Sequence, residues 1–79
     1  MNKKQVLWHI DALEEYSEWQ NEDIKKANKI TKFIKEILRE GVLKGTGKPE
    51  RLKYSAGYSR RIDEYNRLVY EIENDILVI

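Results

Sequence analysis

The stretch from Gly45 to Ile72 decides how this chain folds, and it reads GTGKPERLKYSAGYSRRIDEYNRLVYEI. Residues 44–61, which overlap its first half, hold six basic side chains and one acid, Glu50. A lone carboxylate among cations stays ionised and can act as a general base beside an anionic substrate. Charge runs of this kind are also common on solvated surfaces, so composition alone leaves a plain basic face open.

The flanking segments predict an α+β scaffold. We expect a short strand over residues 4–8 and a helix over 10–19. A second helix is predicted from an N-cap at Asn21 to about Arg39, with Gly41 just past its end. Further strands are predicted over residues 51–54, 58–63, 67–71 and 76–79. Because the helices precede most strands, we expect an N-terminal strand and a two-helix hairpin packed on a small, twisted, antiparallel-rich sheet.

Length and composition narrow the possible functions. The chain has 79 residues and a net charge of +1, so residues 1–79 are expected to form one domain. It has no cysteine and one histidine, which argues against disulfides and zinc and favours the cytoplasm. No apolar run is long enough to span a membrane, and we expect no cofactor. Pro49 and a predicted strand follow Gly47-Lys48, which excludes a nucleotide-binding P-loop.

Lysines recur on one side of the predicted second helix. Lys25, Lys29 and Lys32 are spaced so that they share a helical face. Such a row is either a solvated surface or a line of contacts along an RNA backbone, because phosphate contacts need only positive charge and reach.

Four separate sequence motifs match one known family in their order and spacing. They are YSEWQ at 16–20, GTGKPE at 45–50, SRRI at 59–62 and NRLVY at 66–70. Together they resemble the YoeB/Txe branch of the RelE toxin superfamily, from about Val6 to the end of the chain. The resemblance implies a RelE-like fold and the toxin of a type II toxin–antitoxin system.

The resemblance also implies an activity. Toxins of this branch are mRNA interferases: ribosome-dependent endoribonucleases that cut mRNA in the A site by metal-independent attack of the ribose 2′-OH on phosphate. In the family pattern Glu50 is the base, Arg67 stabilises the phosphate and Arg61 lies beside it. The predicted RNA-binding cations are Lys48, Arg51, Lys53, Arg60, Lys25, Lys29 and Lys32.

The family's general acid and stacking group are a terminal His and Tyr, which match no position in this sequence. His9, the single histidine, is interpreted as structural or surface. The apolar run 76–79 leads us to expect that the natural chain continues. Without the acid, cleavage should be slower by a factor of about 10² to 10⁴ while binding persists.

The resemblance implies a cognate antitoxin (YefM/Axe-like), the ribosome and mRNA as partners, and a homodimer as one assembly. Two other functions stay open on the residues alone. One is a non-catalytic superfamily member such as a ParE-like gyrase inhibitor. The other is a small RNA-binding module without chemistry.

Overall fold

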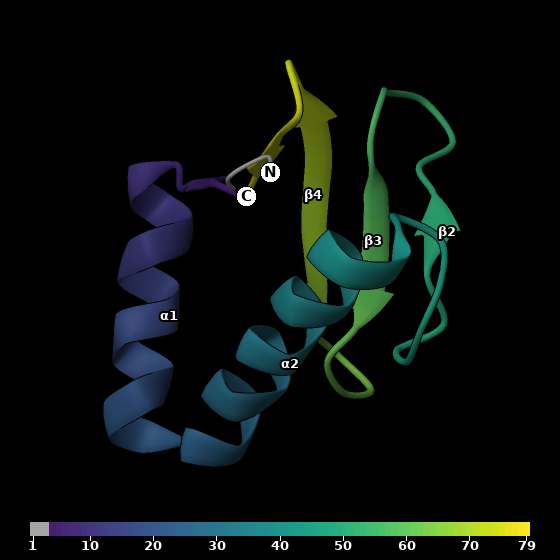
Figure 1. Ribbon diagram of the computed structural model, residues 1–79. Helices are drawn as coiled ribbons and strands as arrows, with labels where there is room; N and C mark the ends of the chain where they lie inside the picture. Colours follow the sequence, from purple (N-terminus) through teal and green to yellow (C-terminus); the bar gives the residue numbers. More distant parts are fainter. Residues whose placement is uncertain (1–3) are drawn as a thin grey trace.

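The computed structural model describes residues 4–79 as two helices and a five-stranded sheet (Figure 1). The elements are β1 (Val6–Leu7), α1 (Ile10–Glu22), α2 (Ile24–Glu40), β2 (Glu50–Arg51), β3 (Tyr58–Arg61), β4 (Arg67–Glu73) and β5 (Ile76–Val78). The strand order is β1-β5-β4-β3-β2, and only the β1–β5 pair is parallel. The predicted α+β fold with an antiparallel-rich sheet is confirmed.

The boundary between the helices differs from the prediction. The N-cap of α2 is Asp23, whose side chain accepts the Lys26 backbone N–H at 3.4 Å, and not Asn21. Asp23 alone leaves the helical region, with φ −149° and ψ 81°, so Asn21 remains inside α1. Gly41 follows α2 with φ 118°, as predicted for a glycine past the helix end.

The observed strand bounds differ from the predicted ones: β3 ends at Arg61 instead of 63, β5 ends at Val78 instead of 79, and β4 runs on to Glu73 instead of ending at 71. The two largest differences are in β2 and β1. The strand predicted over 51–54 is β2, Glu50–Arg51, because the Leu52 N–H already closes the following loop on the Gly57 carbonyl. The strand predicted over 4–8 is reduced to Val6–Leu7. Strand β4 turns into β5 through Asn74 and Asp75, both at positive φ, which is the backbone of a tight two-residue hairpin.

Helix α2 supplies most of the core from one side. Its apolar side chains recur at helical spacing, and Ile30, Phe33 and Ile37 are buried. They pack on the face of the sheet that carries Leu68 and Tyr70, and Figure 1 shows α2 lying across β4 and β3. Only one face of the sheet is therefore covered by α2.

The opposite face of β4 carries different side chains. Successive residues of a strand point to opposite faces, so Arg67 and Val69 point away from Leu68 and Tyr70. Val69 is 53% exposed, whereas Leu68 and Tyr70 are buried. This uncovered side, which we call the open face, is where Arg67, the predicted catalytic residue of β4, lies. No helix in the described part of the chain is long and apolar enough to cross a membrane.

Helix α1 lies beside the sheet and contributes no fully buried side chain. Tyr16 and Trp19 are half-buried and pack against the edge of the core. The ring of Tyr16 lies 5.1 Å from that of Trp8, which tethers α1 to the end of β1.

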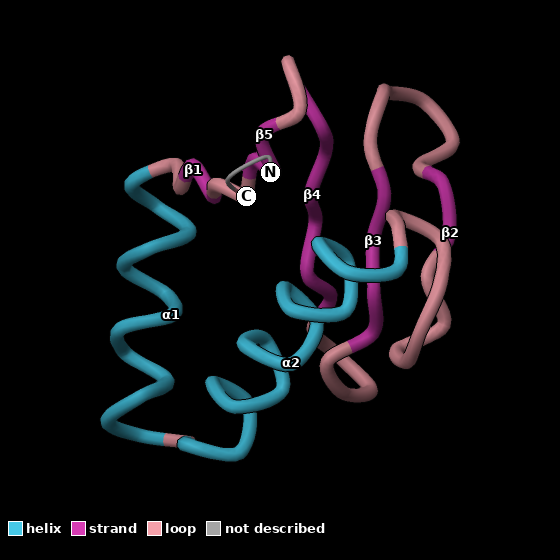
Figure 2. Tube along the Cα trace, in the orientation of Figure 1, coloured by secondary structure: helices cyan, strands magenta, loops and turns pink. Residues whose placement is uncertain are grey.

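The segment 41–49 connects α2 to β2 without regular secondary structure (Figure 2). Gly47 adopts φ 85°, and a Cβ there would lie 2.7 Å from the Phe33 ring. Only glycine fits both the backbone angle and the space. The loop is thereby seated directly on α2.

We expect Gly47→Ala to lower the free energy of unfolding by about 2–4 kcal/mol, because it combines backbone strain with overpacking. Gly41→Ala is the matched control: its φ is also positive, at 118°, but a Cβ there meets nothing within 4 Å. It should cost only about 1–2 kcal/mol. Urea unfolding measures both, and equal losses would show that the loop is not packed against Phe33.

Candidate active site

The predicted base and the predicted phosphate-binding arginine meet on the open face. Glu50 is the first residue of β2. Its Oε1 lies 3.0 Å from Nη2 of Arg67, the first residue of β4. The two residues are far apart in sequence but are brought together through β3, which pairs with both strands. The side chains are 65% and 35% exposed, so the pair is open to a ligand.

Ser59 fixes the orientation of Arg67, a role that the sequence analysis did not foresee. It is buried in β3, and its Oγ accepts a hydrogen bond from Arg67 Nε at 3.0 Å. Two edges of the guanidinium are thus committed, to Ser59 and to Glu50. The remaining N–H groups are available for forked contact with an anion.

Arg61 is the second arginine at this site. It lies directly across from Arg67 in the β3–β4 register and is exposed. Like charges directly opposite each other in a sheet are destabilising unless an anion compensates them. Within residues 4–79 Glu50 pairs with Arg67 only, which leaves Arg61 to attract a further negative group.

The cations around Glu50 are not all on the same side. Lys48 and Lys53 are exposed and flank Glu50 in sequence. Arg51 follows Glu50 in β2 and so turns to the other face, where its guanidinium carbon lies 5.6 Å from the Tyr58 ring centre. The structure therefore does not bring Arg51 together with the carboxylate of Glu50.

The prediction that Arg60 binds RNA is wrong. Its side chain has no exposed surface, because β3 turns Arg60 toward α2 and Arg61 toward the open face. The Arg60 guanidinium forms an ion pair with Glu36 at 3.5 Å and donates hydrogen bonds within the fold. A side chain enclosed in this way cannot reach a nucleic acid.

The lysines of α2 are also separated from the site. Lys25, Lys29 and Lys32 are exposed, but α2 covers the face of the sheet opposite to Glu50 and Arg67. Lys29 donates to the Ile62 carbonyl at 2.7 Å, which ties it to the end of β3. The sheet thus lies between this row and the open face.

A network of hydrogen bonds to the Asp63 carboxylate orders the turn that precedes Arg67. The Asp63 carboxylate accepts from the Asn66 side chain and from the backbone N–H groups of Tyr65 and Asn66, all within 3.1 Å. Lys26 of α2 lies 3.1 Å away. These hydrogen bonds hold the pKa of Asp63 well below its ordinary value. The network fixes the start of β4 and with it Arg67.

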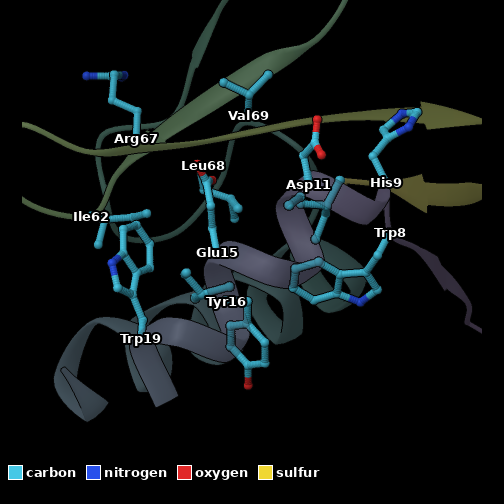
Figure 3. A pocket seen from close by; sticks show the side chains of 13 residues that line it. Trp8, His9, Asp11, Glu15, Tyr16, Trp19, Ile62, Arg67, Leu68 and Val69 are labelled. Atoms are coloured by element: carbon cyan, nitrogen blue, oxygen red, sulfur yellow. The ribbon is translucent and has the colours of Figure 1, made fainter. Parts of the chain in front are cut away.

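A groove of about 330 Å³ runs along the first half of β4 and faces α1 (Figure 3). It exists because β5 pairs only with residues 71–73 of β4. Its walls include Trp8, Tyr16 and Trp19, and Figure 3 shows Arg67 and Val69 projecting from the far side of β4. His9 lies at one end of the groove, where its backbone N–H donates to the Ile79 carbonyl.

No group of three or more His, Cys, Asp or Glu side chains within residues 4–79 is arranged to hold a metal ion. The chemistry that the site itself can offer is that of a carboxylate and two guanidinium groups. A carboxylate can accept a proton, and guanidinium groups can stabilise a phosphate that gains negative charge.

Comparison with known proteins agrees with this geometry. Residues 8–79 match the family described as YoeB-like toxin of bacterial type II toxin-antitoxin system. The family match and the fold together define a toxin of the type II toxin–antitoxin class. The chain belongs to the YoeB-like toxin family, as its sequence motifs predicted.

Individual relatives cover most of the chain. It is 40% identical to Toxin YoeB of Escherichia coli (strain K12) over 76 residues, which cover 94% of this chain and 89% of that protein. A chain of the heterotetrameric YoeB-YefM toxin-antitoxin complex from Staphylococcus aureus superposes with a TM-score of 0.89 at 38% identity, covering 99% of this chain and 92% of that chain. The YoeB dimer from the same organism superposes with a TM-score of 0.90, also at 38% identity and the same coverage.

The environment of Glu36 predicts a loss of stability in acid. Burial alone would raise the pKa of Glu36, but hydrogen bonds from the Thr46 hydroxyl and amide, together with Arg60, lower it below the ordinary value of 4.5. A lowered pKa means that the folded protein stabilises the carboxylate form of Glu36 more than the unfolded chain does. This stabilisation is present above pH 4.5 and is lost as the pH falls through the folded-state pKa.

Urea unfolding from about pH 6 to about pH 3 should therefore show a smaller loss of stability for Glu36→Gln than for the wild type. Glu64→Gln, at an exposed position, is the control and should follow the wild-type curve. An identical pH dependence in wild type and Glu36→Gln would contradict this assignment.

Proposed function

We propose that the protein is a ribosome-dependent endoribonuclease that cuts mRNA in the A site. The observation that carries the proposal is the 3.0 Å pair of Glu50 and Arg67 on the open face, with Arg61 directly across from Arg67. Binding to RNA alone needs only positive charge, whereas cleavage needs a base held beside phosphate-binding groups. A carboxylate paired with Arg67, with Arg61 directly across from that arginine, therefore favours cleavage over a binding-only role.

The proposed reaction begins when the scissile phosphate takes the place of Glu50 on the Arg67 guanidinium. The freed carboxylate accepts the proton of the ribose 2′-OH, and the 2′-oxygen attacks phosphorus. Arg67 and Arg61 stabilise the charge of the five-coordinate phosphate. The 5′-oxygen departs with a proton taken from solvent water, since no acid is assigned among residues 4–79, and leaves a 2′,3′-cyclic phosphate and a 5′-OH.

The exposed ion pair suits this exchange of partners. Surface ion pairs contribute only about 0–1 kcal/mol to stability, so Arg67 can release Glu50 at little cost. Ser59 holds Nε of Arg67 throughout, which keeps the guanidinium in place while its other edge changes partner. We further propose that Lys48 and Lys53 contact flanking phosphates, because they are exposed on either side of Glu50 in sequence.

Glu50→Gln and Arg67→Ala should each lower cleavage by at least about 10²-fold, because each removes a group that acts in the transition state. The measurement maps the 5′ ends of a defined message on programmed ribosomes, using the protein as its gene encodes it. Glu73→Gln and Arg39→Ala are the matched controls: both positions are exposed and lie outside the site, and both variants should cut normally.

Ribosome association, measured in the same samples, should survive Glu50→Gln. Lys53→Ala should weaken association more than Lys32→Ala, since only Lys53 lies close to Glu50 in sequence. A message left whole by the wild type would refute the nuclease, and inhibition of a topoisomerase instead would support the binding-only alternative. Normal cutting by either site variant would remove that residue from the mechanism.

We also propose that a YefM-like antitoxin binds this chain and that two copies can associate. Both assemblies are known for the Staphylococcus aureus proteins whose fold it shares. A small domain buries little surface of its own and gains stability from partners. Light scattering should detect a dimer at micromolar concentration and a larger complex when the antitoxin is added. A monomer under both conditions would contradict the proposal.

A further inference from the structure

Arg60 stands out as a charged side chain with no exposed surface. It reaches from β3 beneath the loop 41–49, and its three nitrogens all donate hydrogen bonds. Nε donates to the Tyr70 hydroxyl at 2.9 Å, and Nη1 donates to the Thr46 carbonyl at 3.0 Å. Nη2 donates to the carbonyls of Gly41, at 3.2 Å, and Lys44. One guanidinium thus holds three carbonyl groups of the same loop.

Glu36 and Tyr70 complete this arrangement from two other elements. The Glu36 carboxylate accepts from the Thr46 hydroxyl at 2.6 Å and from its amide at 3.2 Å, and it balances the charge of Arg60. The Tyr70 hydroxyl accepts from Arg60 and donates to the Val42 carbonyl at 2.6 Å. No buried side-chain polar atom in the described residues lacks a partner.

The far end of the loop is held by β3 itself. The Arg61 N–H donates to the Gly47 carbonyl at 2.6 Å, directly before Lys48 and β2. Lys48 has a positive φ of 49°, a conformation uncommon for a residue with a side chain. The loop is therefore held at several carbonyl groups up to the residue where the chain turns toward Glu50.

We propose that Arg60, with Glu36 and Tyr70, forms a clamp that positions Glu50 at the active site. Arg60 is a positioning residue: it touches neither Glu50 nor a substrate, but it determines where the loop leaves α2 and enters β2. The catalytic part of this inference rests on the proposed nuclease function. The structural part, that the clamp orders the loop, does not.

Arginine is required in the clamp because of its shape. It offers five N–H donors in a rigid plane, whereas lysine offers three donors on one nitrogen. Four acceptors in different directions plus the Glu36 carboxylate cannot all be satisfied by lysine. Since displacement of a reacting group by about 1 Å can lower the rate about 10²-fold, a loosened loop should impair cleavage without weakening binding.

The test compares Tyr70→Phe, which removes one hydroxyl from the clamp, with Tyr58→Phe. Tyr58 stacks on Tyr70 at 5.7 Å, so it is a matched control for the aromatic packing. Hydrogen exchange of the Thr46 and Arg61 amides should be at least about three- to tenfold faster in Tyr70→Phe, because the variant loses both hydrogen bonds of that hydroxyl, to Arg60 and to Val42, and one such bond is worth a factor of about three to ten. The Leu77 amide, bonded to Gln5 in the β1–β5 pair, should be unaffected.

On programmed ribosomes, Tyr70→Phe should lower kcat and leave KM unchanged, and Arg60→Lys should lower kcat at least about tenfold where it folds. Tyr58→Phe should resemble the wild type in every measurement. Loop amides that exchange at the wild-type rate in Tyr70→Phe would overturn the clamp. An unchanged kcat despite faster loop exchange would overturn its catalytic role. A wild type that cuts no message refutes the proposed function, and the exchange data alone then decide the clamp.

Discussion

The guanidinium of Arg60 has to find all its partners inside the protein, because it has no contact with solvent. A buried cation is unfavourable unless it is paired and hydrogen-bonded, and Glu36 together with the carbonyl groups of the loop 41–49 meets that requirement. The same contacts give an irregular loop a defined conformation. In our proposal, the position of β2 and of the Glu50 carboxylate depends on these contacts.

The two faces of β3 and β4 carry side chains with different roles. Inward-pointing Arg60, Leu68 and Tyr70 belong to the core and to the loop contacts, whereas outward-pointing Ser59, Arg61 and Arg67 build the open face. The exposed pair of Arg67 and Glu50 adds little to folding stability. In the proposed mechanism the pair exchanges its partner for a phosphate while Ser59 holds Nε of Arg67.

Much of this arrangement follows from the sequence, but contacts between distant segments do not. The apolar spacing of α2 and the alternation along β4 predicted the core. The isolated acid among cations predicted that Glu50 lies beside basic groups, and it forms an ion pair with Arg67. Alternation along β3 allows only one of Arg60 and Arg61 to point to the open face, and the family pattern placed Arg61 beside the phosphate; the additional assignment of Arg60 to RNA binding ignored this alternation. The partner of Arg60 is Glu36, a residue that looks like an ordinary helix-surface acid until the fold places Thr46 beside it. Likewise, the lysines of α2 could be assigned to a face only once the sheet was known.

The central claim is that a ribose–phosphate link is held between Glu50 and Arg67 on the open face. Cryo-electron microscopy of the protein on a ribosome, with a message whose A-site 2′-hydroxyls are methylated to block attack, tests it most directly. The account predicts a phosphate oxygen within about 3 Å of the Arg67 guanidinium and the adjacent 2′-oxygen beside the Glu50 carboxylate. A message bound along the lysines of α2, with the open face empty, would contradict it.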